Sequence, residues 1–112
     1  MNIDIKLHRE DLPDQITLGD NIAVDCEFMG LNVERDNLCL VQISTGNQDA
    51  HIIQLNRQTY NAPNLIKVLS DKKISKIFHY ARADLLFIKK YLGINVENVN
   101  CTKLMSKIAR SY

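Results

Sequence analysis

This chain of 112 residues has almost no net charge, no even set of cysteines and no long apolar run. A formal net charge of only +1 means that any polyanion must be bound by local basic groups or by bound metal. The three cysteines are odd in number and lack C-x-x-C spacing, which argues against a disulfide framework and a zinc site. No stretch approaches the roughly 18 apolar residues of a membrane span, and none resembles a leader. We therefore expect a soluble protein of the reducing cytoplasm with no membrane partner.

The length and the 46% hydrophobic content are enough to bury one modest core. We therefore predict that residues 1–112 form a single domain, without a second one.

The first half of the chain has the periodicity of strands. Apolar residues alternate with polar ones over residues 3–7, and stronger strand patterns follow at 22–28, 38–44 and 50–55. Residues 32–37, rich in Asn, Asp and charge, are typical of a turn. The three strands after residue 20 are joined by short loops, which predicts an antiparallel meander.

The second half alternates between helix and strand. Helices are predicted over residues 62–70, 81–91 and 102–112, and short strands over 74–78 and 98–101. A meander followed by alternating helix and strand predicts an α/β fold around a mixed sheet.

Local signals support the first two helices. Pro63 suits the first turn of a helix, where its missing N–H does no harm. Leu85, Ile88 and Leu92 would form the buried stripe of the next helix, and Gly93 stands where a C-terminal cap is expected.

Asp25 and Glu27 stand two residues apart where an apolar run ends. Residues at i and i+2 of a strand project from the same face, so both carboxylates would point to one place. Such a pair suits a divalent metal, although a strand that simply ends in two solvated acids has the same pattern.

Asp84 is a candidate for the same place. It falls in the first turns of a predicted helix, just after the strand that ends at Phe78, and ligands gather at the carboxyl ends of strands in α/β sheets. Three clustered carboxylates would repel one another unless cations such as Mg²⁺ or Mn²⁺ were bound between them. The alternative role for Asp84 is to complement the dipole of its helix.

Together these segments resemble the DEDD superfamily of 3′-5′ exonucleases, in its ribonuclease D-like branch. The first motif matches as D-C-E-F-M-G-L at residues 25–31 and the second as H-Y-A-R-A-D at 79–84, with L-C-L-V-Q-I at 38–43 between them. The C-T-K of residues 101–103, followed by A-R-S-Y at 109–112, is similar to small ribonuclease D-like proteins of α-proteobacteria. The resemblance implies a ribonuclease H-like fold.

The resemblance also implies a reaction and its metal ligands. Two divalent ions, Mg²⁺ or Mn²⁺, would support hydrolysis of nucleic acid from a 3′ end, with release of nucleoside 5′-monophosphates. Asp25 would bridge both ions, Glu27 would bind the ion nearest the attacking water, and Asp84 would hold the second ion. Single-stranded RNA is the expected substrate.

The substrate contacts implied by the resemblance lie around the first motif. The backbone near Phe28 and Met29, together with Leu31, would accommodate the terminal nucleotide. His79 would either approach the substrate or cap the end of the strand. Gln42 would either orient a carboxylate or form a hydrogen bond in the core, and we expect the core role.

The family's third motif, Y-x-x-x-D or H-x-x-x-D on a later helix, has no counterpart before Tyr112. That motif supplies a fourth carboxylate and a residue that positions water, so the resemblance implies a C-terminally incomplete domain. We therefore expect this chain alone to be impaired or inactive. An apolar patch at Leu104, Ile108 and Tyr112 would then favour self-association or pairing with a separately encoded C-terminal half.

A competing interpretation is a non-catalytic remnant or a nucleic-acid-binding half-enzyme. Its basic residues would attract phosphates, although such residues more often form a solvated surface. A phosphotransferase with an aspartyl nucleophile is disfavoured, because D-C-E-F-M lacks the second Asp and the Thr of its loop. The basic residues concerned are Lys72, Lys73, Lys76, Lys89, Lys90, Lys103, Lys107 and Arg110.

Overall fold

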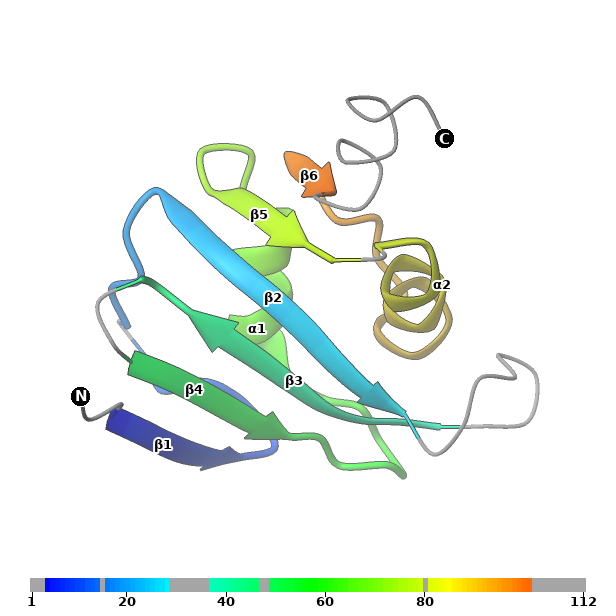
Figure 1. Ribbon diagram of the computed structural model, residues 1–112. Coiled ribbons are helices and arrows are strands. Elements are labelled where there is room, and N and C mark those ends of the chain that lie inside the picture. Colours follow the sequence, from blue (N-terminus) through cyan, green and yellow to red (C-terminus); the bar gives the residue numbers. More distant parts are fainter. Residues whose placement is uncertain (1–3, 15, 29–36, 47–48, 80, 102–112) are drawn as a thin grey trace.

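The computed structural model describes residues 4–14, 16–28, 37–46, 49–79 and 81–101 (Figure 1). The predicted helix over 102–112, its apolar patch and most of the turn predicted at 32–37 lie outside these residues. The described part contains six strands and two helices. In chain order they are β1 (Asp4–Arg9), β2 (Asn21–Phe28), β3 (Leu38–Ser44), β4 (Asp49–Gln54), α1 (Pro63–Ser70), β5 (Ser75–Phe78), α2 (Ala81–Leu92) and β6 (Val99–Cys101).

The strands form one mixed sheet in the order β1-β4-β3-β2-β5-β6. β2, β3 and β4 are antiparallel neighbours, which confirms the predicted meander. β5 runs parallel to β2, β6 runs parallel to β5, and β1 runs parallel to β4 at the opposite edge. The sheet therefore brings the end of β5 beside Val24 of β2, so the segment after β5 begins next to Asp25, where the sequence places its first acidic motif.

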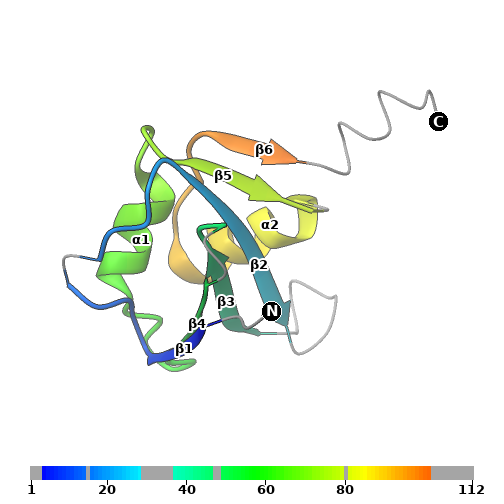
Figure 2. The same ribbon diagram turned by 60° about the vertical axis from the view of Figure 1, so that its left-hand side comes forward.

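Both helices cover the same face of the sheet (Figure 2). Leu65 and Leu69 of α1 and Phe87 and Ile88 of α2 are buried against the inward side chains of the strands. Leu85 is only partly buried but packs against the core, and the stripe predicted for α2 is completed by Phe87, which the prediction did not include. We call the opposite face, which none of the described helices covers, the open face. It carries Ala23, Asp25 and Glu27 of β2, Gln42 and Ser44 of β3, and Ile77 of β5.

The C-terminus of α2 is capped as predicted. Gly93 has a φ of +74°, and its N–H donates to the carbonyl oxygen of Lys89 over 3.0 Å. Glycine adopts this left-handed conformation at little cost, which ends the helix there. Among the described residues, no helix is both long enough and apolar enough to span a membrane.

Lys76 does not belong to a solvated basic surface, so the prediction that placed it among the exposed basic residues was wrong. Its side chain lies on the inward face of β5 and is fully buried, and Nζ donates to the carbonyl oxygen of Asp71 at the end of α1. Burial is the main cause of its lowered pKa, opposed by the charges of Asp71 and Glu97. Lys72, Lys73, Lys89 and Lys90 are exposed, in keeping with a solvated surface.

The N-terminus of α1 is capped from far away in the sequence. Ala62 precedes the helix and offers no capping side chain. The carboxylate of Asp11 instead accepts the N–H of Asn64 over 2.9 Å and that of Leu65 over 2.8 Å. These two bonds fix the segment before β2 to the helix that covers the core.

Asp11→Ala is expected to lower the free energy of unfolding by about 1–2 kcal/mol, the usual cost of a lost helix N-cap. Urea denaturation measures it. Asp14→Ala is the matched control, because Asp14 accepts from the side chain of Asn64 and from no backbone N–H of the described residues, and Asn64 also donates to the carbonyl oxygen of Leu12. Equal losses in both variants would contradict the capping role of Asp11.

Candidate active site

Asp25 and Glu27 project from the open face at the end of β2. Along this strand, buried Val24 and Cys26 alternate with the two exposed acids, which is the alternation that a half-covered strand imposes. The pairing with β3 shifts register between Glu27 and Phe28, and such a bulge re-aims nearby side chains. Asp25 Oδ1 accepts the N–H of Cys26 over 3.0 Å.

Asp84, on α2, interacts electrostatically with this pair of acids. The residue is only 5% exposed, and its Oδ2 has no hydrogen-bond partner among the described residues. Burial, and then the charges of Asp25 and Glu27, raise the pKa of Asp84 to about 7. The charges of the three carboxylates therefore influence one another. Asp84 belongs to α2 on the covered face of the sheet, whereas Asp25 and Glu27 lie on the open face.

Cys26 lies between the two acids in sequence and faces the core. Burial raises the pKa of its thiol well above the usual value, and the charges of Asp84, Asp25 and Glu27 raise it further. The Cys26 thiol therefore stays protonated and neutral at physiological pH, and it lies on the core side of the strand that carries the two acids. No sequence motif indicated a role for Cys26, although the alternation of apolar and polar residues along β2 predicts that it faces inward.

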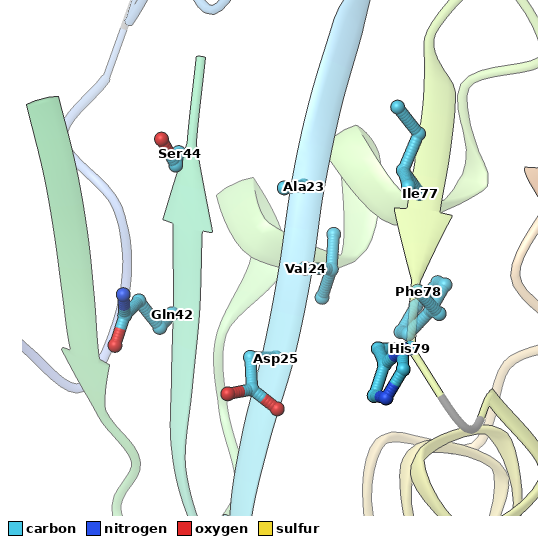
Figure 3. A pocket seen from close by; sticks show the side chains of 8 residues that line it. All are labelled: Ala23, Val24, Asp25, Gln42, Ser44, Ile77, Phe78 and His79. Carbon is cyan, nitrogen blue, oxygen red and sulfur yellow. The ribbon is translucent and has the colours of Figure 1, made fainter. Parts of the chain in front are cut away.

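A hollow of about 380 Å³ lies beside Asp25 on the open face, where β2 passes between β3 and β5 (Figure 3). His79, the residue after β5, is exposed and lines this hollow from the side opposite Gln42. Gln42 is also exposed, as the register partner of Asp25, so its predicted role in the core was wrong. The lining residues are Ala23, Val24, Asp25, Gln42, Ser44, Ile77, Phe78 and His79.

An aromatic stack joins the end of β2 to α2. The rings of Phe28 and Phe87 are stacked with centroids 3.9 Å apart and planes 17° apart. Phe28 directly follows Glu27, and Phe87 lies one helical turn after Asp84, so the stack fixes the two acid-bearing elements against each other. Periodicity alone could not reveal a contact across 59 positions. Met29 and Leu31, the other expected substrate contacts, lie outside the described residues.

Two tyrosines continue this stack toward β3. The ring of Tyr91 lies 6.2 Å from that of Phe87 and 4.9 Å from that of Tyr60. The Tyr60 hydroxyl donates to the carbonyl oxygen of Leu38, and the Tyr91 hydroxyl donates to Asn37 Oδ1. The stack is thereby anchored to the start of β3, opposite the bulge beside Glu27.

The acids fit a divalent metal in their donor type. Carboxylate oxygens are the ligands that Mg²⁺ and Mn²⁺ prefer, and the unpartnered Oδ2 of buried Asp84 is an atom that a cation would satisfy. Within the described ranges, however, no three His, Cys, Asp or Glu side chains are grouped closely enough to hold a metal by themselves. Water, substrate or a further carboxylate would have to complete the ligand set.

These features are those of a nuclease built on a ribonuclease H-like fold, and comparison with known proteins confirms the class. Residues 3–111 match the 3′-5′ exonuclease family. The chain therefore belongs to that family, as its two acidic motifs predicted.

Solved structures of similar proteins share the fold. NrnC of Brucella melitensis with bound Mg²⁺ is 44% identical, with a TM-score of 0.89 over 98% of this chain and 55% of its own. NrnC bound to pGG is 43% identical over 99% of this chain and 55% of its own, also with a TM-score of 0.89. The catalytic core of RRP6 from Trypanosoma brucei is 30% identical, with a TM-score of 0.64 over 74% of this chain and 23% of its own.

A curated relative extends the similarity to plants. Protein RRP6-like 1 of Arabidopsis thaliana is 28% identical over 101 residues, which are 90% of this chain and 16% of that protein. The chain thus spans about half the length of NrnC and a smaller share of the RRP6 proteins.

Proposed function

We propose that the protein removes nucleotides from the 3′ end of single-stranded nucleic acid, with RNA as the substrate, and releases nucleoside 5′-monophosphates. The observation that carries the proposal is the Asp84 carboxyl, whose Oδ2 has no partner among the described residues and whose pKa is raised by burial and then by the charges of Asp25 and Glu27. Membership of the 3′-5′ exonuclease family supports it. A buried carboxyl with a raised pKa beside two further acids is typical of functional sites.

The same three acids are the proposed metal ligands, and NrnC with bound Mg²⁺ supports a metal-dependent site. When bound, a pair of Mg²⁺ or Mn²⁺ ions would activate a water and stabilise the leaving oxygen of the phosphodiester. Asp25 would contact both ions, and its position between Glu27 on its own strand and the hollow beside β5 supports this role. Asp84 would supply its unpartnered Oδ2 from α2.

The hollow beside Asp25 is the proposed place for part of the substrate. Its volume of about 380 Å³ and its polar rim, with Gln42, Ser44 and His79, suit a sugar or phosphate group. NrnC bound to pGG supports a short nucleotide as ligand. Phe28, Met29 and Leu31 remain the proposed contacts of the terminal base, and the reducing cytoplasm remains the proposed location.

The half-enzyme interpretation is the second candidate. It is favoured by the observation that no group of three ligands within the described residues is complete. In that case the chain would bind nucleic acid through the same acids and metal, and hydrolysis would require a separately encoded second half.

The test uses a 5′-labelled single-stranded RNA with Mg²⁺ or Mn²⁺. Because the described residues hold no group of three metal ligands, we expect the chain alone to shorten it from the 3′ end only slowly. Asp25→Ala is expected to reduce that residual rate by more than about 100-fold, because even partners behind a metal ligand contribute about 10–100-fold. Asp20→Asn is the matched control. Asp20 is an exposed acid, and its hydrogen bond with Ser75 uses its backbone carbonyl oxygen, which the substitution keeps.

The pattern of products separates the outcomes. Cleavage that persists in Asp25→Ala, or that proceeds from the 5′ end, would contradict the proposed site. RNA binding in Mg²⁺ that requires Asp25, without cleavage, would favour the half-enzyme.

A further inference from the structure

The outer strand β1 has few contacts that hold it in the sheet (Figure 1). Within the described ranges it pairs with β4 alone. Five of its six residues are exposed, among them Ile5 and Leu7, which therefore contribute little to the core. An element with few buried contacts opens at a smaller cost than the core does. The attachment of β1 thus depends on its ladder with β4 and on its one partly buried residue, His8.

His8 contacts a buried histidine of the neighbouring strand. Its Nε2 lies 2.9 Å from Nδ1 of His51, and the planes of the two rings are 12° apart. Both side chains lie on the covered face, because their register partners Ile53 and Ile43 belong to the core. His51 is only 7% exposed. The pair therefore ties an exposed strand to a buried position of β4.

A carboxylate holds His51 from its other side. Nε2 of His51 lies 3.3 Å from Oδ2 of Asp49. Oδ1 of Asp49 accepts the hydroxyl of Thr45 over 2.7 Å and its N–H over 3.1 Å. The bond from the Thr45 hydroxyl is the largest cause of the lowered pKa of Asp49, so this carboxylate stays ionised at mildly acidic pH. We call His8, His51 and Asp49 the histidine clasp.

One proton lies between the two rings of the clasp. Two ring nitrogens 2.9 Å apart form a hydrogen bond only when one carries a proton and the other does not. A first positive charge on the pair keeps this bond, and Asp49 offsets the charge. A second charge would put a proton on both facing nitrogens, because a charged imidazole is protonated at both of its nitrogens. The bond would then be lost and replaced by repulsion.

Nearby groups oppose that second proton. Lys6 is the register partner of His51 and stands two residues before His8, so it lies on the same face. Asp4 lies 3.7 Å from Lys6, and it is 69% exposed. Burial is the largest cause of the lowered pKa of His8, followed by the charges of His51 and Lys6. A doubly charged clasp is therefore disfavoured in the folded protein.

Other elements around the clasp bring no competing partner to it. β3, which pairs with β4 on its other side, places apolar Ile43 beside His51. Glu10, which follows β1, accepts from the side chain of Asn56, and Asp11 caps α1. The clasp is thus a separate electrostatic unit, far in the sheet from the acids of β2.

We infer that the histidine clasp is a pH-sensitive attachment, which holds β1 to β4 at neutral pH and releases the strand when both imidazoles are protonated. A released strand binds a proton at His8 with the ordinary pKa of 6.5, whereas the attached strand binds it only at lower pH. The stability that the clasp provides is therefore complete above about pH 6.5 and is lost as the pH falls through the lower value. Release would expose the outer edge of β4.

Hydrogen exchange of backbone amides, followed by NMR at pH 7.5 and pH 5, tests the inference. Protection factors are compared, because they remove the intrinsic effect of pH on exchange. We expect the protection of amides between β1 and β4 to fall about tenfold at pH 5, since a difference of one pKa unit changes the opening equilibrium tenfold. Amides between β2 and β3 should not lose protection, because protonation of Asp84 stabilises the core in the same range.

His8→Gln is expected to keep the protection of β1 at pH 5. Glutamine can still donate to His51 but cannot bind a second proton. Lys6→Gln is the matched control, because it removes a neighbouring charge and keeps both imidazoles, so most of the fall should remain. Circular dichroism verifies that each variant is folded. Ring-nitrogen NMR spectra of the wild type measure the titration directly, and His8 should titrate below pH 6.5.

Three results would overturn the inference. The first is titration of His8 at its ordinary value, and the second is an equal loss of protection in the wild type and in His8→Gln. The third is a parallel loss of protection in β2, which would mean that the whole protein opens rather than β1 alone. None of these measurements uses RNA cleavage, so the clasp and the proposed function can fail independently.

Discussion

Asp84→Asn is expected to stabilise the metal-free protein at pH 8 by roughly 2–4 kcal/mol, although it removes a proposed ligand. The pKa of Asp84 rises from 3.8 to about 7 on folding, because the carboxyl is buried beside Asp25 and Glu27. Between these values the folded state holds a proton that the unfolded state releases, so wild-type stability falls as pH rises from about 4 to about 7. Above that window the full cost of the ionised carboxylate remains, and asparagine avoids it.

Urea unfolding at pH 5 and pH 8 in the presence of a chelator measures this effect. The advantage of the variant should be small at pH 5 and largest at pH 8. Adding Mg²⁺ should then stabilise the wild type and not the variant, because a bound ligand stabilises only the state that binds it. Asp20→Asn serves as the control for a lost surface charge. Equal stability changes at both pH values would show that ionisation of Asp84 is not the cause.

Most elements of the fold could be predicted from local pattern. The strands at β2, β3 and β4 and both described helices follow from the periodicity of apolar residues, from Pro63 and from Gly93. Asp25 and Glu27 were placed on one face by the geometry of a strand alone. These features depend on neighbours in sequence, which is why a single sequence suffices for them.

Contacts between distant segments could not be predicted in this way. Nothing local shows that Asp11 caps α1, that Lys76 reaches the carbonyl oxygen of Asp71 from the core side of β5, or that Phe28 stacks on Phe87. Lys76 was expected in solvent because lysine usually is, and its burial depends on where the end of α1 happens to lie. The depth of Asp84 likewise depends on how α2 packs, so the sequence predicted its proximity to the other acids but not its burial.

Phe87→Ala is expected to lower the free energy of unfolding by about 3–5 kcal/mol, the usual cost of removing a buried phenylalanine. Phe87 is fully buried, and its ring contacts both Phe28 and Tyr91, so the cavity would open between β2 and α2. Urea denaturation measures the loss. The neighbouring Leu86→Ala removes a side chain that is 49% exposed and should cost no more than about 1 kcal/mol.

Phe87→Leu separates the role of the ring from that of its volume. Leucine fills most of the space, so we expect a folded protein that loses about 1–2 kcal/mol, mainly the ring contacts with Phe28 and Tyr91. Because the stack ties Glu27 to the helix that carries Asp84, the variant should also bind Mg²⁺ more weakly than wild type, as titration calorimetry would show. Unchanged Mg²⁺ affinity in a destabilised Leu variant would mean that the stack supports the core without positioning the acids.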